Sequence, residues 1–188
     1  MSTAPYPPAI EARARTLELL VLDVDGVLTD GRLRYGPDGE QVKVFHVKDG
    51  LGIKLLREGG VDVAVISGRR APALERRLSD LGVAHVYLGR SDKQRALQEL
   101  REASGVDCDR MAFMGDDVLD LPALRSVGLG ITPADGHFMV RRELAKTGWV
   151  TRASGGDGAV REVTDGLLEA RGQLTAIVEA HLVARGGA

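Results

Sequence analysis

The chain has 188 residues, a formal net charge of −2 and only 4% aromatic residues. This length suffices for one well-buried domain and is short for two, so we predict a single domain over residues 16–188. Near-neutral charge and few aromatic rings argue against a nucleic-acid-binding surface. A small anionic molecule is therefore the expected partner.

The composition also limits the compartment and the metal chemistry. Cys108 is the only cysteine, which excludes an internal disulfide and a zinc site built from cysteines. No window approaches the roughly 18 consecutive apolar residues of a membrane helix, and the first nine residues lack the apolar region of a signal peptide. We expect a cytoplasmic protein without membrane contact, with residues 1–15 as a disordered lead that ends in a short amphipathic piece.

The first strong element is an apolar run over residues 19–22 that leads into Asp23, Asp25 and Gly26. This pattern predicts a buried strand that ends at a turn. Ligands of open α/β sheets bind just outside the carboxyl ends of such strands. Two carboxylates there repel each other, and Mg²⁺ would keep both ionised and attract phosphate oxygens. The stretch predicts metal-assisted phosphoryl chemistry, although a D-x-D-G segment on its own is more often a solvated turn.

Residues 31–47 predict a β-hairpin with its turn at residues 36–39. The apolar residues of its second strand, among them Val42, Val44 and Phe45, fall on both faces. A hairpin of this kind is expected to pack on another subunit.

Helical and strand-like segments alternate along the rest of the chain, as capping residues, glycine stops and apolar spacing indicate. The expected helices cover residues 49–58 with Asp49 as the cap, 72–81, 93–104 with Asp92 as the cap, 137–145, and 159–185 with breaks at Gly166 and Gly172. The expected strands cover residues 61–66, 83–88, 111–114 and 127–131. This alternation predicts an α/β, Rossmann-like three-layer fold with a parallel sheet and the β-hairpin as an insertion.

Four loops that follow strands carry polar groups suited to one site. In chain order they hold Asp23 and Asp25; Ser67 and Gly68; Lys93; and Asp116, Asp117 and Asp120. The Ser67 hydroxyl and its neighbouring backbone N–H groups can bind a phosphate oxygen, and Lys93 supplies a point charge. Each feature alone has an ordinary explanation as a turn, a cap or a solvated helix face. Their order at four strand ends favours a single site.

These four loops resemble the ordered motifs of the haloacid dehalogenase-like phosphatases. Within this superfamily, four segments resemble the 3-deoxy-D-manno-octulosonate 8-phosphate phosphatase family in particular. These segments are DGVLTDG at 25–31, VKDGLGI at 47–53, DK at 92–93 and GGDGAVRE at 155–162. The resemblance spans residues 19–173. It implies a Rossmann-like domain without a cap domain, dependence on Mg²⁺, and a homotetramer in which hairpins form a central barrel.

The resemblance implies a role for each acid. Asp23 would be the nucleophile that forms an aspartyl-phosphate. Asp25 would protonate the departing sugar oxygen and then deprotonate the attacking water. The Asp23 carboxylate, the Asp25 main-chain carbonyl and Asp116 would hold Mg²⁺, with Asp117 behind them.

The remaining motif residues are expected to stabilise charge or bind the sugar. Ser67 and Lys93 would stabilise the transferring phosphoryl group, and Asp120 would orient Lys93 or cap its helix. The expected substrate-binding residues are Lys48, Gly68, Arg69 and Arg161.

Some positions depart from the resembled family. Lys48 stands where arginine is usual and lacks its bidentate fork. His46 and Leu51 stand where asparagine and tyrosine are common, and three extra residues lie between 137 and 150. Arg69 favours the eight-carbon sugar, because nine-carbon acid phosphatases tend to carry an acidic residue there. Arg161 contacts substrate at a neighbouring subunit's site or forms an interface pair.

Three alternatives remain at this point. The substrate is another acidic sugar phosphate, such as a nine-carbon ulosonate 9-phosphate, or a general phosphomonoester. A non-catalytic tetramerising module is the second, but it would be expected to lose its carboxylates. A receiver domain is the third, but it would lack Asp25 and the hairpin.

Overall fold

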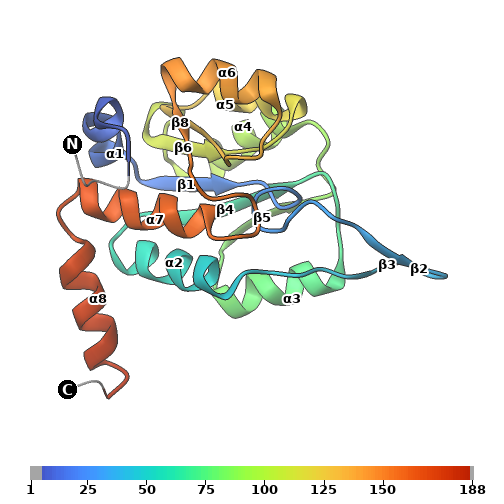
Figure 1. Cartoon of the computed structure of the whole chain (residues 1–188), viewed down its shortest axis with the longest axis horizontal. Coiled ribbons are helices and arrows are strands. Elements are labelled where there is room, and N and C mark those ends of the chain that lie inside the picture. Colours follow the sequence, from blue (N-terminus) through green and yellow to red (C-terminus); the bar gives the residue numbers. More distant parts are fainter. Residues whose placement is uncertain (1–5, 187–188) are drawn as a thin grey trace.

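Six parallel strands form the central sheet of the computed structural model, which describes residues 6–186 (Figure 1). Their order is β5-β4-β1-β6-β7-β8. The strands are β1 (Leu19–Leu22), β4 (Asp62–Ser67), β5 (His85–Leu88), β6 (Met111–Met114), β7 (Leu129–Thr132) and β8 (Trp149–Val150). The predicted α/β class is confirmed, and β1 lies between β4 and β6 in the middle of the sheet.

Helices cover both faces of this sheet (Figure 1). The helical elements are η1 (Pro8–Ile10), α1 (Glu11–Thr16), α2 (Val47–Glu58), α3 (Pro72–Leu81), α4 (Lys93–Ser104), η2 (Cys108–Arg110), η3 (Val118–Asp120), α5 (Leu121–Arg125), α6 (Phe138–Thr147), α7 (Ala159–Ala170) and α8 (Leu174–Val183). Apolar residues of α2, α3 and α7 pack on one face and those of α4, α5 and α6 on the other. None of the described helices is long and apolar enough to span a membrane.

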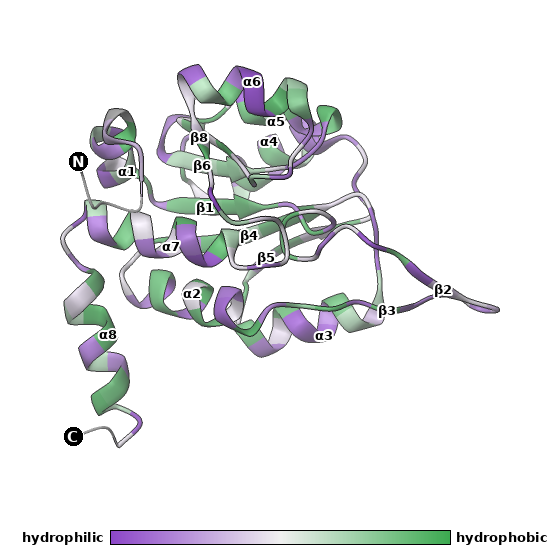
Figure 2. Cartoon of the chain, viewed as in Figure 1, coloured by the Kyte–Doolittle hydropathy of each residue, from purple (hydrophilic) through white to green (hydrophobic). Residues whose placement is uncertain are grey.

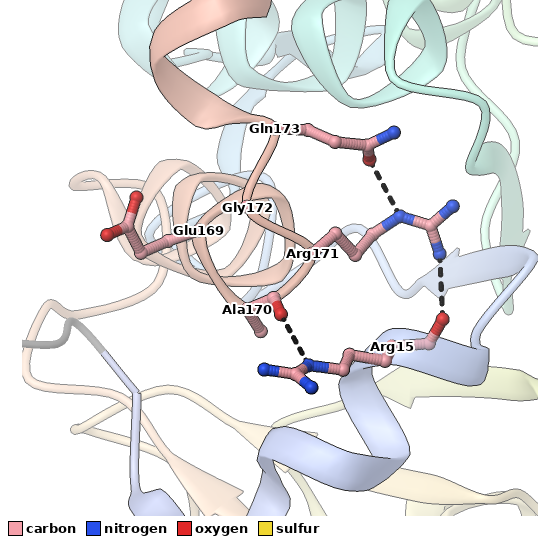
Figure 3. A pocket seen from close by; sticks show the side chains of 6 residues that line it. All are labelled: Arg15, Glu169, Ala170, Arg171, Gly172 and Gln173. Carbon is pink, nitrogen blue, oxygen red and sulfur yellow. Dashed lines mark hydrogen bonds between the residues drawn. The ribbon is translucent and has the colours of Figure 1, made fainter.

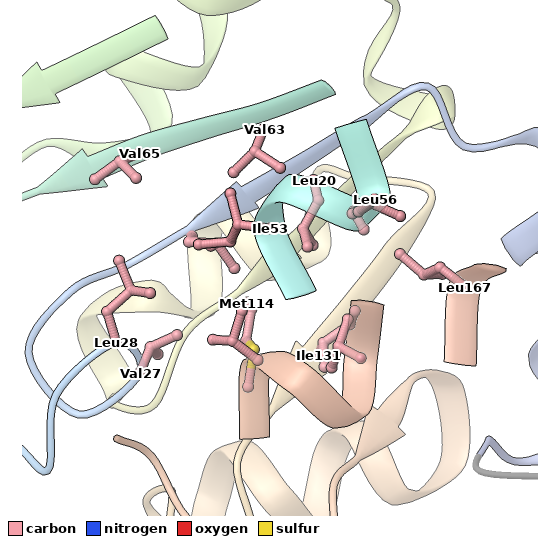
Figure 4. Packing of buried hydrophobic residues seen from close by; sticks show 14 of the residues in the cluster. Leu20, Val27, Leu28, Ile53, Leu56, Val63, Val65, Met114, Ile131 and Leu167 are labelled. Carbon is pink, nitrogen blue, oxygen red and sulfur yellow. The ribbon is translucent and has the colours of Figure 1, made fainter. Parts of the chain in front are cut away.

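The two cores follow from the alternation of side chains along each strand. Leu20 of β1 packs among residues of α2 and α7, including Ile53 and Leu167 (Figure 4). Leu19 and Val21 point to the opposite core, beneath α4 and α6. The central strands are accordingly apolar along their whole length, as Figure 2 shows, which is the usual pattern for a parallel sheet covered on both faces.

Over the residues that the structure describes, the short amphipathic piece expected at the end of the N-terminal lead is present as a helix, whereas residues 8–10 of the expected disordered lead form a helical turn. Residues 8–16 form η1 and α1, and Ile10 and Ala14 are buried in the core. Residues 1–5 of the expected lead lie outside the described part. The proline-rich composition suggested disorder, but apolar contacts hold this segment against the body of the domain.

The first turn of α2 also differs from the prediction. The helix begins at Val47 rather than after Asp49, and Asp49 is buried within it. Its carboxylate accepts a hydrogen bond from the backbone N–H of Arg161, at 2.8 Å. Asp49 therefore connects α2 to the start of α7 instead of capping its own helix.

The C-terminal helical stretch breaks once in the described structure, at Gly172, where a positive φ of 67° separates α7 from α8. The break expected at Gly166 was wrong, because this residue lies inside α7. A Cβ on Gly166 would come within 2.4 Å of the Trp149 ring. The glycine thus permits close packing of α7 on β8.

The predicted hairpin is present as β2 (Arg34–Gly36) and β3 (Gly39–Val42), which within residues 6–186 pair only with each other. It projects away from the sheet (Figure 1). The large apolar side chains of Tyr35 and Val42 in the hairpin, and of Val44 just after it, are exposed in the single chain.

Candidate active site

Four loops meet at the carboxyl ends of β1, β4, β5 and β6 and enclose a cleft of about 320 Å³. The residues that line it are Asp23, Asp25, Ser67, Gly68, Arg69, Ser91, Lys93, Asp116, Asp117, Leu119 and Asp120. All four predicted motifs therefore share one cavity, as expected from strand ends at a common edge. Ser91 and Leu119 were not predicted.

Lys93 lies between two acids at the floor of this cleft. Its Nζ is 2.8 Å from Asp23 Oδ2 and donates a hydrogen bond to Asp120 Oδ1 at 2.5 Å. The second Asp120 oxygen accepts hydrogen bonds from the backbone N–H groups of Asp116 and Asp117, at 3.0 and 3.1 Å. Asp120 thus orients Lys93 and also holds the fourth loop.

The acids of this site suit a hard divalent cation. Asp23, Asp116 and Asp120 each offer a carboxylate oxygen within 4.8 Å of the others. Burial raises the pKa of Asp23 to about 6 despite the Lys93 ammonium. Burial, with the charges of Asp23 and Asp120, raises the pKa of Asp116 to about 7. Crowded carboxylates of this kind fit Mg²⁺, which prefers oxygen ligands.

Asp23 and Asp116 are the better ligand candidates of the three. The oxygens of Asp120 already accept bonds from Lys93 and two backbone N–H groups. Gly26, at φ 89°, brings the first loop against Asp116, because a Cβ there would lie 2.2 Å from Asp116 Oδ2. The sequence D-x-D-G therefore needs its glycine for the close approach of the first and fourth loops.

The raised pKa values predict how stability depends on pH in metal-free protein. Between the ordinary carboxyl pKa of 3.8 and about 7, the folded state binds more protons at Asp23 and Asp116 than the unfolded state does. The free energy of unfolding should therefore fall as pH rises through this range. Thermal denaturation in chelator measures the slope, and Asp116→Asn should reduce it. A flat profile in the wild-type protein would contradict the assignment.

Asp25 is contacted by one residue outside the four motif loops, Lys43, and by Arg69 of the second loop. Lys43, just after β3, donates a hydrogen bond to Asp25 Oδ1 at 2.5 Å, and Arg69 Nε is 3.8 Å from Asp25 Oδ2. The Lys43 ammonium also pairs with Glu40 at 2.7 Å. Burial lowers the pKa of Lys43, but its bonds to Asp25 and Glu40 outweigh burial and raise the pKa above its ordinary value. Lys43 was not predicted as a site residue, although a charge inside an apolar strand-like run was a usable signal.

The expected substrate-binding residues divide into two groups. Gly68 and Arg69 line the cleft beside Ser67, whose hydroxyl accepts a hydrogen bond from the Arg69 backbone N–H at 3.2 Å. Lys48 and Arg161 do not line this cleft.

Arg161 is instead engaged along α7. Its guanidinium pairs with Asp165 at 2.7 Å, and its backbone N–H donates to Asp49. Within one chain these contacts give Arg161 a structural role at the junction of α2 and α7.

The glycine-rich segment before α7 packs on the first loop of its own chain. The Gly156 N–H donates to the Val27 carbonyl at 2.9 Å, and a Cβ on Gly155 would lie 1.8 Å from the Gly26 carbonyl oxygen. No side chain larger than hydrogen fits at Gly155 without movement of this backbone. The segment thus braces the loop that carries Asp23 and Asp25.

A larger hollow of about 440 Å³ lies at the junction of α7 and α8 (Figure 3). The two arginines that line it form hydrogen bonds within the chain. Arg15 donates to the Ala170 carbonyl at 2.9 Å, and Arg171 donates to Gln173 and to the Arg15 carbonyl. These bonds fasten the N-terminal helix to the end of α7, so the hollow is a structural joint.

Comparisons of the sequence and of the fold with known proteins identify the same family of phosphatases. A model of the haloacid dehalogenase-like hydrolases matches residues 46–128. The 3-deoxy-D-manno-octulosonate 8-phosphate phosphatase of Escherichia coli K12 is 42% identical over 90% of this chain and 89% of its own length. The corresponding crystal structure from Yersinia pestis has a TM-score of 0.85 at 41% identity, and covers 92% of this chain and 96% of its own.

The enzyme of the same name from Moraxella catarrhalis, crystallised with magnesium, phosphate and KDO, has a TM-score of 0.86 at 36% identity. That likeness covers 92% of this chain and 98% of the other. The similarity therefore extends across the whole fold rather than a single motif.

Proposed function

This chain belongs to the 3-deoxy-D-manno-octulosonate 8-phosphate phosphatase family of haloacid dehalogenase-like hydrolases, and on that premise we propose how its own residues hydrolyse this sugar phosphate. The reaction releases the free sugar acid and phosphate. The convergence of four acidic and basic loops in one cleft carries the assignment of roles. A non-catalytic module or a receiver domain is not favoured, because the paired carboxylates of the first loop lie in that cleft.

Asp23 is the nucleophile in this proposal. Its carboxylate attacks phosphorus, and the bond from phosphorus to the sugar oxygen breaks, leaving an aspartyl-phosphate. Asp25 donates a proton to the departing oxygen and then takes one from the water that hydrolyses the intermediate. Ser67 and Lys93 stabilise the charge on the phosphoryl oxygens, and Lys93 is oriented for this by Asp120.

The cofactor of the proposed reaction is Mg²⁺. The carboxylates of Asp23 and Asp116 and the main-chain carbonyl of Asp25 would hold it, with Asp117 behind them. When bound, the ion offsets the negative charge shared by the acids and the phosphate. The related phosphatase from Moraxella catarrhalis binds magnesium, and the crowded acids of this chain supply the matching ligand chemistry.

A comparison of sugar phosphates tests the substrate. Purified protein with Mg²⁺ should release phosphate from 3-deoxy-D-manno-octulosonate 8-phosphate with a kcat/KM far above that for glucose 6-phosphate, since Arg69, which lines the cleft, is proposed to favour an acidic sugar. A nine-carbon ulosonate 9-phosphate serves as the close competitor. Equal rates on all three compounds would refute the substrate, and faster hydrolysis of the nine-carbon compound would assign the chain to that alternative.

The hairpin supports a proposed homotetramer. Tyr35 is 65% exposed, and Val42 and Val44 are about half exposed in the single chain. Apolar side chains gathered on an exposed surface are typical of a protein interaction site. Association through hairpins would bury them, and Arg161 could then face a neighbouring site. Light scattering at micromolar concentration tests this, and a monomer would reject it.

A cytoplasmic location remains a prediction from the single cysteine.

A further inference from the structure

We propose that Lys43 is a positioning residue for Asp25, so that the hairpin sets the orientation of the acid-base carboxyl. The inference deepens the function proposed above and rests on it. It concerns a side chain that lies outside the four motif loops and outside the set of cleft-lining residues.

The burial of Lys43 is the first observation. As whole residues its neighbours Val42 and Val44 are 49% and 52% exposed and Lys43 is half-buried, and the Lys43 side chain alone is 3% exposed. The chain therefore turns a charged group inward at a place where apolar groups face outward. A buried ammonium is costly unless it is paired, so its partners must explain its position.

The partners form a short chain of charges that ends at the proposed acid-base residue. Glu40 Oε1 lies 2.7 Å from Lys43 Nζ, and the ammonium donates to Asp25 Oδ1 at 2.5 Å. Glu40 lies three residues before Lys43 and is itself mostly buried. Glu40 therefore holds the Lys43 ammonium on the hairpin side, and Asp25 of the first loop accepts its hydrogen bond on the other side.

Arg69 is a weaker candidate for the same task. Its Nε is 3.8 Å from Asp25 Oδ2, beyond hydrogen-bond distance, and its side chain is 46% exposed. Arg69 also donates to the Tyr35 hydroxyl at 3.4 Å. Lys43 is thus the close, buried contact that fixes one oxygen of Asp25 and leaves the other towards the cleft.

A fixed carboxyl matters because proton transfer needs hydrogen-bond reach to the reacting oxygen. Loss of Lys43 would let the Asp25 side chain rotate away from that oxygen. Displacements of about 1 Å in such groups cost on the order of 10²-fold in rate. The hairpin would then contribute to catalysis through the orientation of Asp25.

The test compares Lys43→Met with Lys146→Met, a matched change at an exposed lysine of α6. On the sugar phosphate, Lys43→Met should lower kcat by about 10- to 100-fold with little change in KM. On p-nitrophenyl phosphate, whose leaving group departs without a proton, the burst of nitrophenolate should keep its rate while steady-state turnover falls. Lys146→Met should behave as wild type in both assays.

A double-mutant cycle separates positioning from general damage. In an Asp25→Asn background, Lys43→Met should cause no further loss, because the group that it positions is already gone. An equal loss in both backgrounds would overturn the inference, and so would a raised KM at unchanged kcat, which would mean that Lys43 binds substrate directly. Glu40→Gln, which keeps the lysine, should give a smaller kcat loss of the same kind.

The outcomes also distinguish this inference from the proposed substrate. If wild-type protein hydrolyses p-nitrophenyl phosphate but not the sugar phosphate, the substrate is wrong and the cycle is still measured on the nitrophenyl ester. If wild type hydrolyses the sugar phosphate and Lys43→Met equals it, the substrate stands and the positioning role falls.

Discussion

Asp23→Asn is expected to remove phosphatase activity, with a fall in kcat of at least about 10⁴-fold. The amide has no carboxylate oxygen to attack phosphorus, and it offers a poorer ligand to Mg²⁺. The protein should remain folded, because burial disfavours the charge at this position and asparagine has the same shape. Phosphate release at saturating sugar phosphate, together with a thermal melt, measures both effects.

The matched control is Asp107→Asn. Asp107 forms an exposed ion pair with Arg101 at 2.9 Å, and neither residue lines the cleft. Exposed ion pairs contribute little to stability. Its rate should equal that of wild type. An Asp23→Asn protein that retains a substantial part of the wild-type rate would refute the aspartyl-phosphate mechanism.

Removal of magnesium is expected to have the second large effect. Dialysis against a chelator should lower turnover by at least about 10³-fold, since a catalytic cation supplies several kcal/mol of charge stabilisation. The structural reason is the acid cluster of Asp23, Asp116 and Asp120, which would otherwise repel a phosphate dianion. Added Mg²⁺ should restore the rate and raise the melting temperature at pH 7, because the ion binds the folded state.

Calcium provides the control for that experiment. It is larger and takes more ligands at longer distances than Mg²⁺, so it should raise the melting temperature without restoring turnover. Asp116→Asn should increase the Mg²⁺ concentration needed for half-maximal rate. Full activity in protein whose metal content is measured as zero would contradict the proposed site.

The motif residues could be predicted from the sequence because they depend on local pattern and on one topological rule. Asp23 and Asp116 follow apolar strands and Ser67 ends one, and the carboxyl ends of parallel strands share an edge of the sheet. Strand order along that edge was not required for the prediction. The position of Lys93 followed from its place at a helix start.

The features that were missed depend on contacts between distant segments. Lys43 lies 18 residues after Asp25 and donates to it from the end of the hairpin, whereas the local pattern only places it in the second strand of the predicted hairpin. A glycine such as Gly166 usually favours a break in a helix, but the Trp149 ring packs against Gly166 and the helix continues through it. Asp49 has the pattern of a cap and binds the start of α7 instead. Tertiary packing decides each of these cases against local preference.

The brace between the glycine-rich segment and the first loop has a consequence for biosynthesis. Asp23, the proposed nucleophile, is synthesised well before residues 155 and 156, whose backbone supports its loop. Contacts so distant along the chain form late. Until those residues have been made, the nascent polypeptide lacks the support of this loop, so the proposed capacity to take up phosphate should be acquired only after them.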